Sequence, residues 1–378
     1  MPDKRPLYKI IIDDLKDKIE VGLYAPEAQL PTEVELAEQY GVSRITSKRA
    51  LIELEREGLI YRKRGSGSYV KQPDDSDVIP YNGVQNSNSI VSMILPYMAT
   101  NEFEYIRAAT DYLDAKGYYL SIHNSNWSKD KEKELLLKLS KSGLSGIILY
   151  PLSTISNVDM VNAISSNGYP IVTMDQYFDS LNVSSVVSDN YTGGYLAASK
   201  LIELGHERIA FISSVSIEFR SSVRDRYLGY CQALKDSRIP IDSEWVYTDF
   251  YRDVNEKNSK TFYQSLLAKL LSQKVTAIQA EHDILAGELL RNALDAGISI
   301  PKQLSIVGFD DHETSRHAEI PITTIAQNYY ELGRSAAELI VAGIENKDSE
   351  RRRIKVPVRL IERESTGVQP NREDIILF

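Results

Sequence analysis

Cysteine is almost absent from this chain of 378 residues, which contains only Cys231. A single thiol excludes an intramolecular disulfide and a zinc site built from several cysteines, so we interpret Cys231 as a small apolar packing residue. The sequence has no run of 18 apolar residues and no apolar N-terminal stretch with a small-residue cleavage site. We therefore expect neither a transmembrane helix nor a secretory signal, and predict a cytoplasmic protein without a membrane partner.

The motifs of several common enzyme classes are also missing. There is no GxSxG elbow, no HExxH helix, no Walker A loop, and no GxGxxG motif that follows a strand. Five histidines are scattered along the chain, and the spacing of His312 and His317 does not define a metal site. We predict that the protein is not an enzyme and uses no cofactor or metal.

Acidic residues outnumber basic ones over the whole chain, but the basic residues are concentrated in one segment. The chain carries a net charge of −9, whereas residues 41–71 hold eight lysines and arginines against three acidic residues. The remainder, residues 72–378, holds 31 basic and 41 acidic residues. A compact basic segment attached to an acidic body indicates a nucleic-acid contact surface near the N-terminus.

An amphipathic first helix is predicted to end near Gly22, with one apolar face formed by Leu7, Ile11, Leu15 and Ile19. Thr32 and Glu35 form the S/T-x-x-E capping box that opens a second helix, which Gly41 ends.

A third helix is predicted to start after Ser43, which acts as its N-cap, and to run to about Glu57. Helix, short turn and helix in this order give helix-turn-helix spacing. Cations crowd the first two turns of the third helix, where a recognition helix meets bases and phosphates: Arg44, Lys48 and Arg49, together with Thr46.

Two short strands follow, Leu59–Arg62 and Ser68–Val70, and a Gly-Ser-Gly turn joins them. Arg62, Lys63 and Arg64 place three cations near the tip of this hairpin. A basic hairpin beside a recognition helix is a wing, so we predict a small α+β winged helix-turn-helix domain over residues 1–71.

This segment resembles the winged helix-turn-helix of the GntR family, on the strength of LPTEVELAEQYGVSRIT, the RAL-x-x-L-x-x-x-GLI run and the G-x-G-x-x-V wing end. The resemblance implies that the third helix contacts DNA and that Gly65 and Gly67 shape a minor-groove wing. Val34 and the Ser47-Lys48 pair depart from common family residues, so the resemblance does not define the base preference at those points. The full predicted DNA-binding set is Glu33, Ser43, Arg44, Thr46, Lys48, Arg49, Arg62, Arg64, Gly65 and Gly67.

Residues 72–89 are rich in Asp, Asn, Ser and Pro and are predicted to form a linker. From there to residue 378, apolar runs alternate with helical patterns, which predicts parallel α/β sheets in two Rossmann-like lobes. The expected strands are SIVSMILP, YYLSIHN, GIILYP, PIVTMD, SVVSD, RIAFISS, WVYTDF, AIQAEH and LSIVGFDD.

Ligands bind such sheets beyond the carboxyl ends of the strands or between lobes. Polar residues follow several predicted strands, namely Asp175, Asp189-Asn190, His282-Asp283 and Asp310-Asp311. Carboxylates that read paired hydroxyls, a forked arginine and an aromatic ring together make a site for a neutral sugar. The available arginines are Arg224 and Arg226, and the available rings are Phe103, Tyr105, Phe250 and Tyr251.

Residues 89–366 resemble the effector domain of the LacI family, which is similar to periplasmic sugar-binding proteins. The matching stretches are SDNYTGGYLAASKLIELGHERIAFIS, the R-x-x-x-x-G at Arg224–Gly229, SIVGFDD followed by PITTIAQ, and VRLIERES. The resemblance implies that Arg224, Asp310, Asp175 and Gln327 line the effector cleft, and that His282-Asp283 replaces the usual Asn-Asp pair. The full predicted effector-binding set is Phe103, Asp175, Arg224, His282, Asp283, Asp310 and Gln327.

A GntR-type head on a LacI-type body resembles the arabinose repressor group of bacterial transcription regulators. This implies a homodimeric repressor of carbohydrate-use genes that binds operator DNA and is released by a small sugar, with a pentose such as arabinose as the first expectation. Two alternatives stay open at this point: a sugar-dependent activator, and a stand-alone sugar-binding protein.

Overall fold

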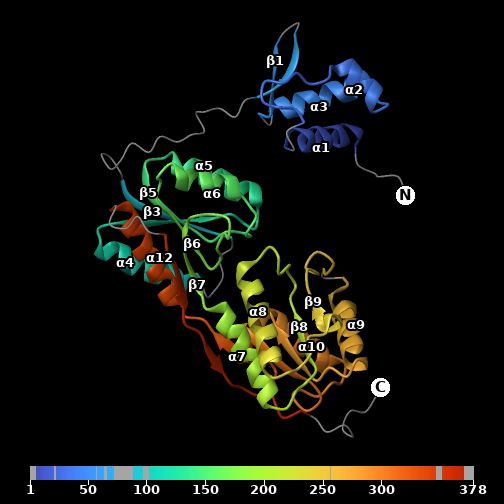
Figure 1. The fold of residues 1–378 in the computed structure, drawn as a ribbon, viewed down its shortest axis with the longest axis vertical. Helices are drawn as coiled ribbons and strands as arrows, with labels where there is room; N and C mark the ends of the chain where they lie inside the picture. Colours follow the sequence, from blue (N-terminus) through green and yellow to red (C-terminus); the bar gives the residue numbers. More distant parts are fainter. Residues whose placement is uncertain are drawn as a thin grey trace. The chain divides into compact units, whose positions relative to one another are not determined.

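The computed structural model describes residues 6–20, 23–56, 58–63, 66–71, 88–96, 102–255, 257–345 and 351–369. The chain divides into two compact units, Met1–Ile79 and Pro80–Phe378, which are described separately (Figure 1). Of the predicted linker, only residues 88 and 89 are among the described residues.

The N-terminal unit contains three helices and a hairpin, namely α1 (Leu7–Glu20), α2 (Glu33–Gln39), α3 (Arg44–Arg56), β1 (Ile60–Lys63) and β2 (Gly67–Val70). The predicted capping box is confirmed, because the Thr32 side chain accepts from the Glu35 N–H and the Glu35 carboxylate accepts from the Thr32 N–H. Gly41 has the expected left-handed φ of 61°. The core lies between the three helices and the hairpin, and includes Ile11, Leu36, Leu51 and Leu54.

The hairpin is antiparallel, and Tyr61 pairs with Tyr69 across it. A third segment joins its edge, since Leu30 N–H donates to Ser68 O and Val70 N–H donates to Ala28 O, both at 2.9 Å. The hairpin is therefore held by the backbone that precedes α2 as well as by its own turn.

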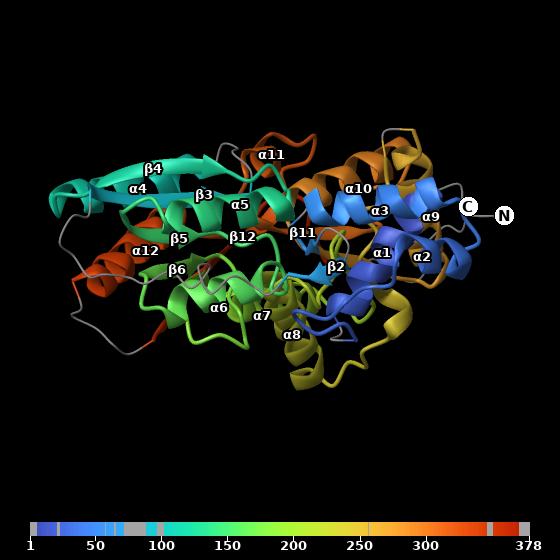
Figure 2. The same cartoon turned by 90° about the horizontal axis from the view of Figure 1, so that it is seen from above.

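The C-terminal unit has two lobes, each built on a six-stranded sheet (Figures 1 and 2). The sheet of lobe 1 has the order β13-β7-β6-β5-β3-β4, and every pair in it is parallel. Its strands are β3 (Asn88–Leu95), β4 (Tyr119–Asn124), β5 (Leu144–Leu149), β6 (Ile171–Met174), β7 (Ser184–Ser188) and β13 (Arg353–Val356). Its helices are α4 (Glu102–Ala115) and α12 (Tyr329–Ile344) on one face, and α5 (Lys129–Ser140) and α6 (Val158–Ser166) on the other.

The sheet of lobe 2 has the order β14-β12-β11-β10-β8-β9 and is parallel except for β14. Its strands are β8 (Ile209–Ile212), β9 (Val246–Tyr247), β10 (Ala277–Ala280), β11 (Ser305–Asp310), β12 (Thr323–Ala326) and β14 (Arg359–Ile361). Helices α7 (Asn190–Glu203) and α8 (Ser221–Asp236) cover one face, and α9 (Ser259–Ser272) and α10 (Asp283–Asp295) cover the other. The short elements η2 (Ser243–Trp245) and α11 (Glu313–His317) complete this lobe.

The central strands of both lobes are buried, as parallel sheets require, because helices exclude water from both faces. The predicted α/β fold with two lobes is confirmed. Strands β12, β13 and β14 were not among the expected strands. Strands β13 and β14 form the ends of the two sheets, and β12 lies between β14 and β11.

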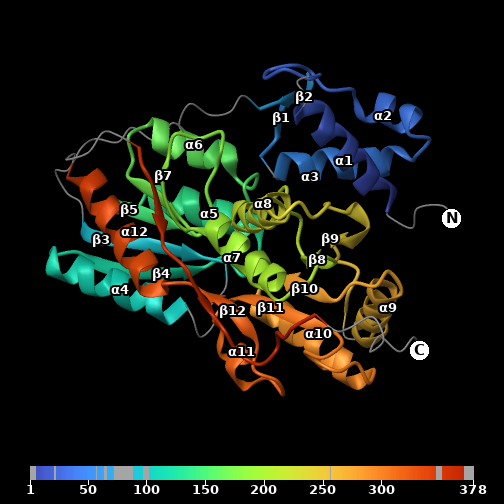
Figure 3. The ribbon, with the colours of Figure 1, turned by 60° about the horizontal axis from the view of Figure 1, so that its bottom comes forward.

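The chain passes between the lobes three times: at Asp189 between β7 and α7, at Gln327-Asn328 between β12 and α12, and at Pro357-Val358 between β13 and β14 (Figure 3). Lobe 1 is therefore completed by α12 and β13, which come from the C-terminal part of the sequence. Of these crossover residues, Gln327 lines the cavity between the lobes.

Helices α7 and α8 pack unusually closely because of two glycines. A Cβ on Gly194 would overlap the Arg226 carbonyl, and a Cβ on Gly229 would overlap the Tyr191 carbonyl. This close contact fixes the position of α8, which carries Arg226.

Two further features are absent from the residues that the structure describes. No helix there is long and apolar enough to cross a membrane. No group of three or more His, Cys, Asp or Glu side chains there is arranged to hold a metal ion.

Candidate functional site

The N-terminal unit presents a basic surface at the start of α3. Ser43 caps this helix by accepting from the Thr46 N–H at 3.2 Å, as the sequence predicts. The Arg44 side chain is 71% exposed, and Lys48 and Arg49 are exposed as well. The buried side of α3 carries Ser47, Ala50, Leu51 and Leu54. Helical periodicity thus separates the core face from a cationic face that is free to meet a polyanion.

Glu33, the first residue of α2, connects the recognition helix to the wing. Its carboxylate accepts from Arg62 Nη2 at 2.6 Å and from Arg44 Nε at 3.3 Å. Burial raises the pKa of Glu33, but the hydrogen bonds from Arg62 and Arg44 outweigh that effect, so the net pKa lies below its ordinary value. A carboxylate repels phosphate, so we assign Glu33 to the orientation of two arginines.

The wing carries a second cluster, made of Tyr61, Tyr69 and Lys63. The two rings stack with centroids 5.6 Å apart, and Lys63 Nζ lies 5.3 Å from the Tyr69 centroid. Near the turn, Gln29 Nε2 donates to Ser66 O at 2.8 Å, and a Cβ on Gly67 would stand 2.8 Å from the same Nε2. Glycine at position 67, with φ of 122°, thus lets the Gln29 amide support the wing turn.

The other predicted DNA-binding residues lie as follows. The Arg49 guanidinium of α3 lies over the Tyr8 ring of α1, 4.0 Å from the ring centroid, which restricts its position. The hydroxyl groups of Thr46 and Ser43 form a hydrogen bond of 2.9 Å with each other. Arg64 and Gly65 lie outside the described residues, so their predicted roles stay predictions.

In the C-terminal unit, a cavity of about 330 Å³ lies between the lobes, at the low end of the size range of small-molecule pockets. Both lobes contribute to its wall, lobe 1 through Tyr105, Trp127, Tyr150 and Tyr329, and lobe 2 through Arg226, Glu281 and Asp310. Four aromatic rings and several paired charges therefore surround one small space.

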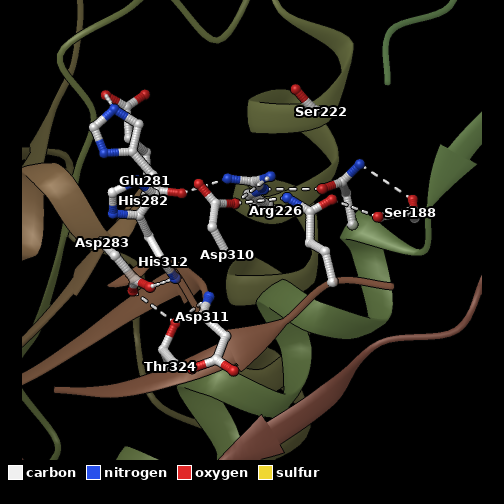
Figure 4. A network of polar contacts seen from close by, with 12 residues as sticks. Ser188, Ser222, Arg226, Glu281, His282, Asp283, Asp310, Asp311, His312 and Thr324 are labelled. Carbon is white, nitrogen blue, oxygen red and sulfur yellow. Dashed lines mark hydrogen bonds and ion pairs between the residues drawn. The ribbon is translucent and has the colours of Figure 1, made fainter. Parts of the chain in front are cut away.

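Arg226 is the central polar group of this cavity (Figure 4). It projects from α8, is 5% exposed, and lies over the Phe309 ring at 3.6 Å. Its guanidinium donates to Asn190 Oδ1 at 2.9 Å, to Glu281 O at 2.5 Å and to Asp310 Oδ1 at 3.4 Å. One side chain thus joins the ends of β10 and β11 to the start of α7.

Gln327 and Ser188 continue this network into the crossovers. Gln327 Nε2 donates to Asp310 Oδ1 at 2.6 Å, and Ser188 Oγ hydrogen-bonds to Gln327 Oε1. Asn190 Nδ2 donates to Ser188 O at 3.1 Å. Two of the three crossovers are therefore tied to the same Arg226–Asp310 pair that faces the cavity.

The carboxylates of the cavity differ in environment. Asp175, 5% exposed and with φ of 66°, is held at the end of β6. Burial raises its pKa, and the Arg226 charge partly opposes that rise. Glu281, 1% exposed, accepts from Ser213 Oγ at 2.5 Å and from Ser214 N–H at 2.8 Å. Acceptors, a forked donor and aromatic faces in one cavity suit a ligand with several hydroxyls.

Comparisons with known proteins place both units. Residues 7–70 match the family of bacterial regulatory proteins called gntR, and residues 198–366 match the periplasmic binding protein-like domain. The arabinose metabolism transcriptional repressor of Geobacillus stearothermophilus is 31% identical over 349 residues, which cover 90% of this chain and 92% of that protein.

The chain therefore belongs to the family of transcriptional repressors that includes this Geobacillus stearothermophilus protein. The arabinose metabolism transcriptional repressor of Halalkalibacterium halodurans is 29% identical over 91% of both chains. Among solved structures, a LacI family transcriptional regulator from Enterococcus faecium with bound ribose is 28% identical and has a TM-score of 0.61. The match covers 74% of this chain and 99% of that regulator. The predicted GntR–LacI combination and the resemblance to the arabinose repressor group are confirmed.

Four residues of the predicted effector set reach the cavity of this repressor: Asp175, His282, Asp310 and Gln327. His282 caps α10, with Nδ1 accepting from the Leu285 N–H at 3.0 Å. The strand-end rule found these residues because the carboxyl ends of parallel strands converge on one edge.

Three residues of the predicted set do not line the cavity, namely Phe103, Arg224 and Asp283. Phe103 is 62% exposed on α4, and Asp283 is fully buried beneath the cavity wall. Arg224 contacts Tyr177 and Asp179 instead. Residues 224 and 226 are two apart on a helix, which turns them about 200° from each other, so only one of them faces the cavity.

Several cavity residues were missed by the sequence reasoning. Arg226 and Tyr105, which the sequence offers as an available arginine and an available ring, line the cavity, whereas the available ring of Phe250 is buried in the core of lobe 2. Trp127 has φ of 56° in a loop after β4, where no pattern indicated a ligand contact. The remaining unpredicted wall residues are Tyr150, Gln176, Val215, Arg220, Ser222, Val223, Glu281, Ile284, His312 and Tyr329.

Proposed function

We propose that this protein is a transcriptional repressor of carbohydrate-use genes, which a small sugar releases from its operator by binding in the cavity between the lobes. The observation that carries the proposal is the position of Arg226. Its guanidinium faces a cavity with four aromatic rings and hydrogen-bonds to residues at two strand ends and to Asn190 at the first crossover. A ligand held there touches both lobes and the network that connects them.

The sugar that we propose first is a pentose such as arabinose. Curated relatives with similarity along nearly the whole chain are arabinose metabolism repressors, and a similar LacI family regulator holds ribose. The cavity supports a polyhydroxylated ligand, because Asp175, Glu281 and Asp310 accept and Arg226 donates, while the aromatic rings offer apolar faces to a sugar ring. The effector residues proposed here are Asp175, Arg226, His282, Asp310 and Gln327.

The DNA surface that we propose is the exposed start of α3 together with the wing. Arg44, Lys48 and Arg49 face outward there, and Glu33 holds Arg44 and Arg62 in one arrangement. Arginine forks suit base edges and phosphates, whereas Lys48 suits a phosphate. Replacing Lys48 by Ala should weaken binding to the operator and to unrelated duplexes by a similar factor. It should also reduce the slope of log K for binding against log salt concentration by about 1.

The assembly that we propose is a cytoplasmic homodimer without catalytic activity. Two symmetric heads match the two half-sites of a palindromic operator, which one head does not. Sugar lowers DNA affinity by binding one state of this dimer more tightly than the other, and a typical coupling free energy of about 1–3 kcal/mol gives roughly a 5- to 150-fold change.

Fluorescence anisotropy with duplexes from the protein's own promoter region tests the proposal. We expect salt-sensitive binding that L-arabinose weakens, with D-ribose and D-xylose as comparison sugars. Arg44→Ala should weaken operator binding and leave sugar binding intact. If the purified full chain shows no salt-sensitive affinity for these duplexes, the proposal is wrong.

Two alternatives are separated by further measurements. A reporter gene behind the same promoter distinguishes repressor from sugar-dependent activator, because deletion of the protein raises expression in the first case and lowers it in the second. A stand-alone sugar-binding protein would bind the sugar without any sugar-sensitive DNA complex.

A further inference from the structure

Helix α8 of lobe 2 is capped by a residue of lobe 1. The residue at its N-cap position, Arg220, makes no side-chain cap hydrogen bond. Instead, Gln176 Oε1 accepts from the Ser221 N–H at 2.8 Å and from Ser221 Oγ at 3.1 Å. Gln176 lies just after β6, so the first free N–H group of a helix in one lobe is satisfied by the other lobe.

The contact is reciprocal and buried. Tyr177 N–H donates to Ser221 Oγ at 3.0 Å, and Gln176 Nε2 donates to Ser222 Oγ at 3.2 Å. Gln176 is 1% exposed, Ser221 0% and Ser222 5%. Polar groups with so little access to water depend on these partners, so separation of the lobes breaks all of them together.

A second layer of contacts lies behind the first, outside the cavity. Tyr177 Oη donates to Asp225 at 3.0 Å and accepts from Arg224 Nη2 at 3.0 Å. Arg224 also pairs with Asp179 at 2.8 Å. The Tyr177 ring itself is covered by the guanidinium of Arg353, which lies 3.4 Å from the centroid. The loop 176–179 of lobe 1 is thus fastened to the first turn and a half of α8.

Further contacts link the same segments. Thr154 of lobe 1 donates from its N–H to Phe219 O at 2.9 Å, and Arg220 lies 5.1 Å from the Trp127 centroid. The segment that leads into α8 is therefore held by lobe 1 along its length.

We propose that Gln176, Tyr177 and Ser221 are positioning residues that set the equilibrium between closed and open lobes, and through it the sugar affinity. This inference rests on the proposed function. Tyr177, Ser221 and Arg224 do not line the cavity, whereas Gln176 and Ser222 do. A change at Tyr177 therefore acts on the sugar only through the fraction of protein in the closed state, which scales the apparent dissociation constant.

The test compares full-length Tyr177→Phe with wild type and with Tyr330→Phe. The control removes a similar contact, since Tyr330 Oη donates to Asp111 at 3.3 Å, but both of its residues belong to lobe 1. Hydrogen–deuterium exchange of the ligand-free proteins follows the amides of residues 176–179 and 221–225. Isothermal titration with L-arabinose and D-ribose measures the affinity.

We expect Tyr177→Phe to speed exchange at both segments, to leave the core of α10 protected, and to weaken sugar binding about three- to ten-fold. Tyr330→Phe should change neither. Saturating sugar should restore slow exchange at both segments in Tyr177→Phe. Unchanged protection of the α10 core in the ligand-free variant is what excludes a general loss of stability.

The inference is overturned if exchange at residues 221–225 is unchanged in Tyr177→Phe, or if exchange rises equally throughout lobe 2. It is also overturned if the sugar affinity falls as much in Tyr330→Phe. If wild type binds neither sugar, the proposed function is wrong in its ligand, whereas the exchange of the ligand-free proteins still decides the contact between the lobes.

Discussion

Asp283 lies directly against Gly308, and a Cβ at position 308 would overlap its Oδ1. The same carboxylate accepts from His312 N–H at 2.7 Å and contacts Thr324 Oγ1 at 2.6 Å. Burial, reinforced by the nearby Asp310 charge, raises the pKa of Asp283 from 3.8 to about 8. Asp283 therefore supports the turn behind Asp310 and His312, and its surroundings favour the protonated acid over the carboxylate.

Protonation of Asp283 makes stability depend on pH. The unfolded carboxyl ionises near pH 4, whereas the folded one keeps its proton up to about pH 8, so folding takes up a proton between these values. This contribution is complete below the lower value and is lost as the pH rises through the window. The unfolding free energy of the wild type should therefore fall as the pH rises, by up to about 1.4 kcal/mol per pH unit from this group between pH 5 and 7. Asp283→Asn cannot ionise and should remove this decrease.

Urea unfolding followed by tryptophan fluorescence measures this slope, because both tryptophans, Trp127 and Trp245, belong to the C-terminal unit. Asp114→Asn, at an exposed position near the end of α4, is the matched control and should leave the slope unchanged. An unaltered slope in Asp283→Asn would mean that this carboxyl is ionised in the folded protein.

Arg226→Lys should strongly weaken sugar binding without affecting the operator complex. Lysine keeps the charge but cannot reach Asn190, Glu281 O and Asp310 together, and it leaves buried acceptors unpaired. We expect a loss of about 2–3 kcal/mol in sugar binding, roughly 30- to 150-fold, measured by isothermal titration. Arg291→Lys, on the exposed side of α10, is the control. Retained sugar affinity in Arg226→Lys would remove this residue from the effector site.

Glu33→Gln should reduce the preference for operator over unrelated DNA by about ten-fold, equivalent to about 1.4 kcal/mol. The substitution removes the carboxylate that orients Arg44 and Arg62, but it also removes a negative charge near the phosphates. Non-specific affinity should therefore hold or rise while specific affinity falls. Anisotropy with both duplexes measures the ratio, and Glu38→Gln on the same helix should leave it unchanged.

Two glycine substitutions should change stability in opposite directions. Gly194→Ala places a Cβ against the Arg226 carbonyl and should destabilise the C-terminal unit by about 1–3 kcal/mol. Gly287→Ala, inside α10 with no atom within 4 Å of the added Cβ, should stabilise it by about 0.5–1 kcal/mol. Urea unfolding measures both changes. If Gly194→Ala does not lower the unfolding free energy, the contact between α7 and α8 can adjust to the added Cβ.

The sequence predicted the elements of the fold better than the identity of the cavity residues. Buried strands such as Ile171–Met174 are mainly apolar and are followed by polar residues, so both the strand and Asp175 were visible in the pattern. Strand β13, with the sequence RIKV, was not, because an edge strand that alternates with charge resembles a surface loop.

The choice between Arg224 and Arg226 depended on a helix phase that the R-x-x-x-x-G motif does not contain. Packing decides it, because Gly194 and Gly229 fix how α8 is turned against α7. Trp127 illustrates a second limit, since it reaches the cavity from a loop whose left-handed backbone has no sequence signature. Contacts made between lobes are set by tertiary structure, which local patterns do not describe.

The order in which the strands occur has a consequence for biosynthesis. The sheet of lobe 1 needs β13, and that of lobe 2 needs β14, so neither is complete until residues 353–361 have been made. The N-terminal unit uses only contiguous chain and has all its elements by Val70. During translation the proposed DNA-binding unit can therefore fold while residues 71–361 are still to be made, and a truncated product would carry this unit without the proposed sugar-binding unit.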